Sequence, residues 1–306
     1  MHRPASSAGT GVLLGIIAYG LWGLFPLYFH LLDSVSPVEI VANRVVWSLA
    51  FLLVLIVMTR TWAKVLRAAR STRNVLLLGL AAVFLSLNWG TYVWSVITNQ
   101  VVEASLGYFI NPLVSVALGV VLLRERLRVG QWVAVGIAVL AVGVLTVSYG
   151  RPPWISIVLA VSFGIYGLIK KQVGVGSVES LTIETAVLSP VALVVMVIIA
   201  QRGESGLTSG DPGLTFLLIL LGVVTALPLL AFGGAANRIP LSTLGLLQYL
   251  TPVIQFLLAI AVFHEAMNLS RWIGFLLVWV SLVIMSVDGL RSSRSRTTAL
   301  EVIEPD

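Results

Sequence analysis

The chain lacks cysteine and has few residues that could hold a metal or a phosphate. None of its 306 residues is cysteine, which excludes disulfides, thiolate nucleophiles and cysteine metal sites. Its histidines, His2, His30 and His264, are scattered and predict no metal site. It has no glycine-rich phosphate loop, which argues against an ATP-driven pump. We therefore expect no cofactor, no metal and no catalytic residues.

Charge is also scarce. Charged residues make up 10% of the chain and hydrophobic residues 58%, and the mean hydropathy is +1.02. Soluble domains carry about 25% charged residues, so most of this chain must be solvated by lipid. A net charge of +6 would suggest nucleic acid in a soluble protein. Here the basic residues lie in short loops, which is typical of membrane orientation, and we expect no nucleic-acid partner.

Long apolar runs recur along the whole sequence. A helix needs about 20 apolar residues to cross hydrocarbon about 30 Å thick. The runs exceed the roughly 10 alternating residues of a barrel strand, so they predict an all-α membrane protein. The first is too long for a signal-peptide core and lacks a cleavage site. The ten expected transmembrane helices cover residues 11–32, 37–59, 75–98, 103–123, 129–148, 153–169, 180–200, 213–236, 241–263 and 271–290.

The basic residues between these spans predict the orientation of the chain. With the N-terminus in the cytoplasm, fifteen lysines and arginines fall inside, and only Arg151, Arg202 and Arg271 fall outside. This bias follows the positive-inside rule and predicts that both termini are cytoplasmic. The polar segment 291–306 is expected to be a cytoplasmic tail.

The two halves of the chain repeat one pattern. Residues 111–132 and 251–272 each contain a proline, a glutamate thirteen residues later and a tryptophan seven beyond that. The glutamates, Glu125 and Glu265, are expected to neutralise and orient their loops. Five spans per half is an odd number, so the second half must enter the membrane from the opposite face. Such inverted repeats are typical of secondary transporters. The alternative is a simple gene duplication in a protein that does not use alternating access. The expected units are 1–149, 150–290 and the tail 291–306.

Polar and aromatic side chains within the spans predict the binding site, because they are costly in lipid. Asn88, Tyr92, Ser95 and Asn99 follow one helical face, and similar stripes occur in spans four and nine. One interpretation is that these polar side chains pack the helices against one another. We favour a wet cavity that binds a small-molecule substrate. The candidate substrate-binding residues are Tyr19, Trp22, Asn88, Tyr92, Asn99, Tyr108, Asn111, Tyr166, Gln248 and Gln255.

Charged residues in or beside the spans predict gating or coupling. By rise per residue, Arg44 and Glu184 lie about 15 Å apart in depth, so a direct pair is not expected. We predict an external Arg44–Glu103 pair that closes over the cavity, and a pair between Glu184 and Lys170 or Lys171. The alternative for Arg44 and Glu184 is anchoring at the interface.

Four stretches resemble RarD proteins, which belong to the EamA group of the drug/metabolite transporter superfamily. They are "WGLFPLYF" (22–29), "NRVVWS" (43–48), "EASLGYFINPL" (103–113) and "STLGLLQYLTP" (242–252). The resemblance extends over residues 10–290. It implies ten helices in two inverted EamA-type repeats around a central cavity, in a bacterial inner membrane. It also implies export of small metabolites or drugs.

Together these features predict an inner-membrane secondary transporter that exports a small amphipathic metabolite or drug-like compound by alternating access. Aromatic faces would bind its apolar part and amides would orient its polar groups. Proton coupling through Glu103 or Glu184 and uncoupled facilitated diffusion are both open. A channel, or a membrane-embedded enzyme, is the alternative. The sequence does not predict the substrate, the coupling ion, the direction of transport or the oligomeric state.

Overall fold

The computed structural model describes residues 5–123, 129–236, 238–239, 247–284 and 287, and every regular element among them is a helix. The helices are α1 (Ala5–Gly23), α2 (Phe25–His30), α3 (Pro37–Thr59), α4 (Trp62–Ala69), α5 (Thr72–Ile97), α6 (Val101–Leu123), α7 (Val129–Tyr149), α8 (Trp154–Val173), α9 (Ser177–Gln201), the short 3₁₀ helix η1 (Gly206–Thr208), α10 (Pro212–Ala236), α12 (Leu250–Ala261) and a helix over Leu269–Ile284.

Six helices in the described part of the chain are long and apolar enough to cross a membrane. They cover Gly9–His30, Pro37–Thr59, Thr72–Ile97, Val129–Ser148, Val178–Gln201 and Pro212–Phe232. Shorter apolar helices cover Trp154–Lys170, Leu250–Ala261 and Leu269–Ile284. The predicted all-helical membrane fold is confirmed, and the count of ten spans stays a prediction.

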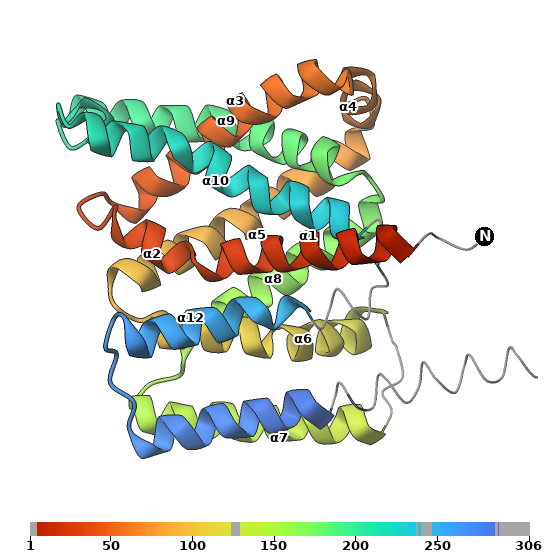
Figure 1. Ribbon diagram of the computed structural model, residues 1–306, viewed down its shortest axis with the longest axis vertical. Helices are drawn as coiled ribbons and strands as arrows, with labels where there is room; N and C mark the ends of the chain where they lie inside the picture. The colour runs from red at the N-terminus through yellow and green to blue at the C-terminus, as the bar shows by residue number, and fades with distance from the viewer. Residues whose placement is uncertain (1–4, 124–128, 237, 240–246, 285–286, 288–306) are drawn as a thin grey trace, which may run out of the picture.

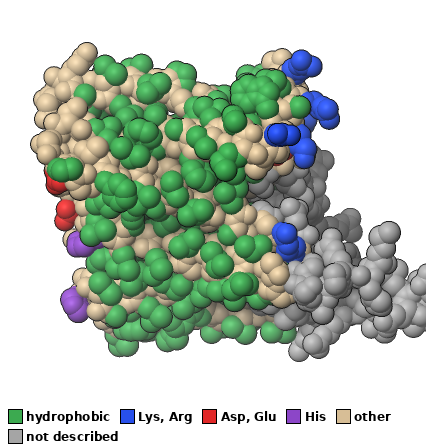
Figure 2. Space-filling model, turned by 45° about the horizontal axis from the view of Figure 1, so that its top comes forward, with side chains coloured by type: hydrophobic (Ala, Val, Ile, Leu, Met, Phe, Trp, Pro, Cys, Tyr) green, Lys and Arg blue, Asp and Glu red, His purple; other side chains and the backbone are tan. Residues whose placement is uncertain are grey.

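The outside of the bundle is apolar between two polar ends. Figure 2 shows hydrophobic side chains over the middle of the molecule, Lys and Arg side chains at one end, and acidic and His side chains at the other. Val57, Met58 and Val147 are 70%, 77% and 83% exposed. Soluble proteins rarely expose an apolar surface of this extent, so this band contacts lipid.

Local signals fix where several helices begin and end. Ser36 caps α3 by accepting a hydrogen bond from Glu39 N at 3.3 Å, and Pro37 follows where its missing N–H costs nothing. Ser71 caps α5 in the same way. Gly174 ends α8 with φ of 64°, a left-handed conformation that glycine adopts without strain.

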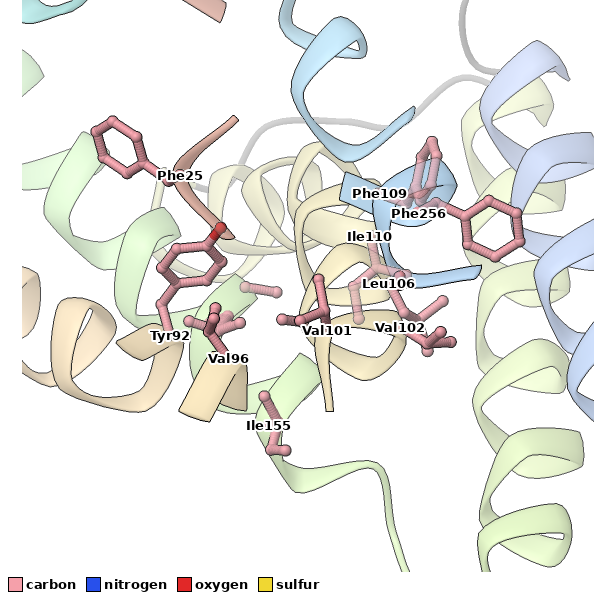
Figure 3. Packing of buried hydrophobic residues seen from close by; sticks show 14 of the residues in the cluster. Phe25, Tyr92, Val96, Val101, Val102, Leu106, Phe109, Ile110, Ile155 and Phe256 are labelled. Carbon is pink, nitrogen blue, oxygen red and sulfur yellow. The ribbon is translucent and has the colours of Figure 1, made fainter. Parts of the chain in front are cut away.

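Helices from the two halves of the chain pack against each other. In Figure 1, α1 lies beside α10, and α7 lies beside the helix Leu269–Ile284. In addition, α8 packs on α5 and α6, α3 on α9 and α10, and α12 on α6 and α1. One buried apolar cluster runs through this arrangement, from Phe25 and Tyr92 to Phe109 and Phe256 (Figure 3).

The two halves start at opposite ends of the bundle. Gly11, near the start of α1, packs against Ile239, just after α10. Ile155, at the start of α8, donates its backbone N–H to Glu103, at the start of α6. We call the end with α4 and the start of α1 the amino-terminal end, and the end where α6 starts the opposite end (Figure 1). Glu103 lies in the first turn of α6.

Candidate functional site

Arg44 lies buried in an aromatic box inside the bundle, and its side chain is 2% exposed. Its guanidinium carbon is 5.5 Å from the ring centre of Phe25, 5.2 Å from that of Phe29 and 4.2 Å from that of Trp89. Its Nε donates a hydrogen bond to Thr225 Oγ1 at 3.2 Å. Thr225 belongs to α10, so the second half of the chain completes the box.

The predicted Arg44–Glu103 pair is wrong for this structure. Arg151 Nη2 is 2.9 Å from the Glu103 carboxylate, which also accepts the backbone N–H of Ile155 at 3.0 Å. Glu103 stands in the first turn of α6 and faces the N-terminus of α8, where N–H groups favour an anion. The depth of Arg44 and Glu103 along their spans did not reveal where the Glu103 side chain points, because that direction depends on how the helices pack.

The predicted Glu184–Lys170 pair is confirmed. Lys170 Nζ lies 2.7 Å from Glu184 Oε1 and also contacts the Ser180 hydroxyl. The hydroxyl of Tyr166 donates to Glu184 Oε2 at 3.3 Å. All four residues lie on α8 and α9, toward the amino-terminal end. Tyr166, predicted as a substrate-binding residue, is therefore engaged with this ion pair.

Gln255 joins the two halves through a carbonyl that a proline leaves free. Pro26 has no N–H to donate to the carbonyl of Trp22, one turn before it. Gln255 Nε2 donates to that carbonyl at 3.1 Å and to the Tyr92 hydroxyl at 2.9 Å. The amide thus connects α12 with the first span and with α5.

Three further side chains from the predicted set, those of Asn88, Tyr19 and Trp22, pack against their neighbours. Asn88 Nδ2 donates to the carbonyl of Leu159 at 2.9 Å and to Ser162 Oγ at 3.1 Å, which ties α5 to α8. The Tyr19 ring meets the Trp22 ring at 5.5 Å, edge to face. For Asn88, these contacts match the reading of polar side chains as links between helices.

Two predicted residues stand apart from these contacts. The structure contradicts the placement of Asn99 on a helical stripe, because α5 ends at Ile97. Asn99 is exposed and has φ of 53°, a left-handed conformation that asparagine tolerates and that breaks the helix. Gln248 is half-buried just before α12.

Five of the predicted residues form what we call the central cluster: Arg44, Tyr92, Tyr108, Asn111 and Gln255. The Phe29 ring, which contacts Arg44, lies 5.9 Å from the ring of Tyr92. The Tyr92 ring in turn lies 5.7 Å from that of Tyr108, and Asn111 follows one turn later on α6. Arg44, Asn111 and Gln255 are each 2% exposed, so the polar side chains of the cluster are buried, and Tyr108 is partly exposed.

The central cluster contains polar atoms that are not satisfied. Among the described residues, Arg44 Nη1, Asn111 Oδ1 and Gln255 Oε1 are buried without a hydrogen-bond partner. Leaving a buried donor or acceptor unpaired costs about 1–3 kcal/mol, and more for a charged group. Most buried polar groups in native proteins are paired. Three such atoms among these five residues make the central cluster a candidate ligand site.

A groove of about 510 Å³ lies apart from this cluster, at the side of the bundle. It runs between α3, α5 and α9, and its lining includes Ala42, Trp94 and Val191. These side chains are mainly apolar, and Val191 is exposed on the outer surface. The groove is therefore not the polar cavity that the stripes predict.

Sequence reasoning missed what Glu265 binds. Its carboxylate accepts the backbone N–H groups of Val101 at 2.5 Å and Val102 at 3.0 Å, so it caps α6 from the other half of the chain. Burial raises the pKa of Glu265 to about 7, against the lowering effect of these hydrogen bonds. The repeated pattern singled out Glu265, but nothing in it identified α6. Its counterpart, Glu125, lies outside the described residues.

Comparison with known proteins identifies the chain. The EamA-like transporter family matches it over residues 9–147 and again over 153–287. The chain belongs to this family. "Protein RarD" of Streptomyces exfoliatus is 53% identical over 296 residues, or 97% of this chain and 94% of that protein. An "Uncharacterized transporter" of Vibrio cholerae is 43% identical, over 98% of this chain and 99% of that one.

The resemblance to RarD-type EamA transporters is thereby confirmed. A solved crystal structure, 18% identical, aligns with a TM-score of 0.60 over 90% of this chain and 97% of that chain, and it supports the fold alone. The family, its relatives and the apolar helices indicate a multi-pass bacterial membrane transporter rather than an enzyme.

Proposed function

We propose that this EamA-like transporter is a secondary transporter of the bacterial inner membrane that exports a small amphipathic compound by alternating access. The observation that carries this proposal is the central cluster. Arg44, Asn111 and Gln255 are buried in it, and it includes residues from both halves of the chain. One nitrogen and two oxygens of these side chains have no partner among the described residues. A ligand bound among them would supply those partners.

We further propose that the halves 1–149 and 150–290 are inverted repeats. The helix contacts occur in pairs that such a repeat would produce: α1 packs on α10 as α8 packs on α5, and α6 packs on α8 as α12 packs on α1. The family also matches each half separately. The opposite starting ends of α1 and α8 support the inversion. Two related halves of opposite orientation can exchange conformations, which exposes a central site to each side in turn.

Ion pairs at the two ends would close the site in alternation. At the opposite end, Glu103 pairs with Arg151 and Glu265 caps α6. Toward the amino-terminal end, Glu184 pairs with Lys170. In this mechanism each pair breaks when its end opens. Protonation of Glu103 or Glu184 would weaken the corresponding pair and could couple transport to protons.

Counterflow in proteoliposomes tests the proposal. Vesicles with the purified protein are preloaded with one unlabelled compound from a panel of amphipathic acids, amines and drugs, and uptake of its labelled form is followed. We expect preloading to accelerate uptake of at least one compound. Flux without acceleration would indicate a channel instead, and no protein-dependent flux of any compound would contradict the proposal.

A matched pair of variants tests the role of the central cluster. Gln255→Met removes both hydrogen bonds to Trp22 and Tyr92 at similar side-chain size, and we expect it to slow counterflow about tenfold or more. Gln201→Met makes the same exchange at the exposed end of α9 and should leave counterflow unchanged. Equal rates for the two variants would remove Gln255 from the site.

A further inference from the structure

Within the part of the chain that the structure describes, no carboxylate pairs with the charge of Arg44. Its side chain is 2% exposed, and within the described residues its hydrogen-bonded side-chain partner is the neutral hydroxyl of Thr225. Burying an unpaired ion is costly, so buried charges in proteins are normally paired with an opposite charge. In membrane spans, ionisable residues of this kind mark substrate or ion pathways.

The buried carboxylates among the described residues, Glu39, Glu103 and Glu184, have other partners. Glu103 bonds to Arg151 and to the start of α8. Glu184 bonds to Lys170 and Tyr166. Glu39, on the same helix as Arg44, accepts hydrogen bonds from Ser205 Oγ and Gly206 N, both at 2.9 Å.

The aromatic box offsets only part of this cost. Arg44 faces the rings of Phe25, Phe29 and Trp89, and cation–π contacts of this kind favour the charged guanidinium. A ring face offers no hydrogen-bond acceptor of ordinary strength, however, and Nη1 stays without one. The box therefore holds Arg44 charged and fixed in place, and among the described residues the N–H groups of Nη1 have no acceptor.

We propose that Arg44 binds a carboxylate group of the transported compound, so that the substrate is an amphipathic organic acid. This proposal rests on the proposed function, because it assigns a ligand to the same site. Among the described residues the buried Nη1 has no acceptor, and a guanidinium favours the planar oxygen pair of a singly charged carboxylate. A phosphate would leave most of its oxygens unpaired in so apolar a place. The aromatic side chains beside Arg44, including Tyr92 and Tyr108, would contact the apolar body of the acid.

Acid–amide pairs that differ in charge but hardly in shape test this assignment. The probes are benzoate with benzamide, 3-phenylpropionate with 3-phenylpropionamide, and octanoate with octanamide, with phenyl phosphate as a further arm. Binding to the purified full-length protein in detergent is measured at neutral pH by thermal shift and by titration calorimetry. We expect at least one acid to bind about tenfold or more tightly than its amide, the difference typical of a charge-assisted hydrogen bond.

Variants connect that preference to Arg44. In Arg44→Gln the acid should lose its advantage over the amide. Arg44→Lys should keep part of it, because lysine retains the charge but loses the planar guanidinium. Arg202→Gln removes the same charge from an exposed loop position and should change nothing. If Arg44→Gln fails to fold, the test rests on two measurements. They are the preference of the wild type for the acid over the amide, and the reduction of that preference in Arg44→Lys.

Several results would overturn the proposal. They are equal binding of acid and amide by the wild type, no binding of any acid, retention of the acid preference in Arg44→Gln, and tighter binding of phenyl phosphate than of the carboxylates. Failure of the proposed function looks different: acids would bind through Arg44, yet no compound would show counterflow. Counterflow of neutral compounds that is unaffected in Arg44→Gln would support transport and contradict the carboxylate site.

Discussion

At the scale of single residues, two sets of backbone groups that lack a partner in their own helix are satisfied from across the bundle. Pro26 frees the carbonyl of Trp22, and Gln255 of the other half donates to it. Glu265 similarly caps α6, whose first N–H groups have no partner within their own helix. In each case a backbone group without a partner in one half of the chain forms a hydrogen bond with a side chain of the other half.

The raised pKa of Glu265 predicts a pH dependence of stability. A folded-state pKa of about 7 lies above the ordinary value of 4.5, because burial disfavours the charged form. Between these values the folded protein holds a proton that the unfolded chain has released, so the free energy of unfolding falls as pH rises. Glu265→Gln cannot titrate and should flatten this decline. The apparent thermal midpoint in detergent, measured from pH 4.5 to 8, reports the difference.

The other charged groups near Glu265 have smaller effects on its pKa. Arg271 lowers it and Glu103 raises it, both less than burial does. Glu204→Gln, at an exposed loop position, serves as the control and should leave the wild-type profile unchanged. Parallel profiles for wild type and Glu265→Gln would show that Glu265 does not titrate in this range.

At the scale of helices, one close crossing sets the position of the candidate site. Gly222 of α10 lies against the backbone of Trp47 on α3, and a Cβ at this position would overlap the Trp47 carbonyl. Thr225 follows one turn later on α10 and accepts the hydrogen bond from Arg44, which lies one turn before Trp47. The absence of a side chain at 222 thus lets Thr225 reach Arg44.

Gly222→Ala is therefore expected to separate α3 from α10. Overpacking of this kind typically costs about 1–3 kcal/mol, so the thermal midpoint and the counterflow rate should both fall. Gly143→Ala is the matched control, because a Cβ at this helical position of α7 meets nothing within 4 Å. An unchanged midpoint in Gly222→Ala would mean that the crossing adapts without cost.

At the scale of the whole molecule, the basic and acidic ends predict the orientation in the membrane. The amphipathic helix α4 carries Lys64 and Arg67, at the same end as the start of α1 (Figure 1). Positive segments stay in the cytoplasm, so α4 and the N-terminus should face inward, and the loop around Asp211 should face outward.

Single cysteines test this orientation without background, because the chain has no cysteine of its own. Ala69→Cys on α4 and Ser209→Cys in the loop before α10 are both exposed positions. We expect an impermeant thiol reagent to label Ser209→Cys in intact cells and Ala69→Cys only after lysis. Labelling of Ala69→Cys in intact cells would reverse the orientation.

The sequence by itself determined the class of fold, because burial in lipid requires long apolar helices whatever their arrangement. Helix ends such as Ser36 and Gly174 also depend on local sequence, since capping and left-handed turns involve neighbouring residues, although the expected span 153–169 stopped before Gly174. The sequence singled out Arg44, Tyr92 and Gln255, because polar groups in apolar spans are rare. The Lys170–Glu184 pair was predictable for a similar reason, since the two lie near one face of the bundle on consecutive spans.

Only the tertiary structure decided which partner each polar group meets. The sequence placed Arg44 and Glu103 on one side of the membrane, but the direction of a side chain around its helix depends on packing. That packing turns Glu103 toward Arg151 and the start of α8, and it surrounds Arg44 with Phe25, Phe29 and Trp89. Contacts between residues far apart in the sequence have no local signal, because they exist only once the helices are assembled.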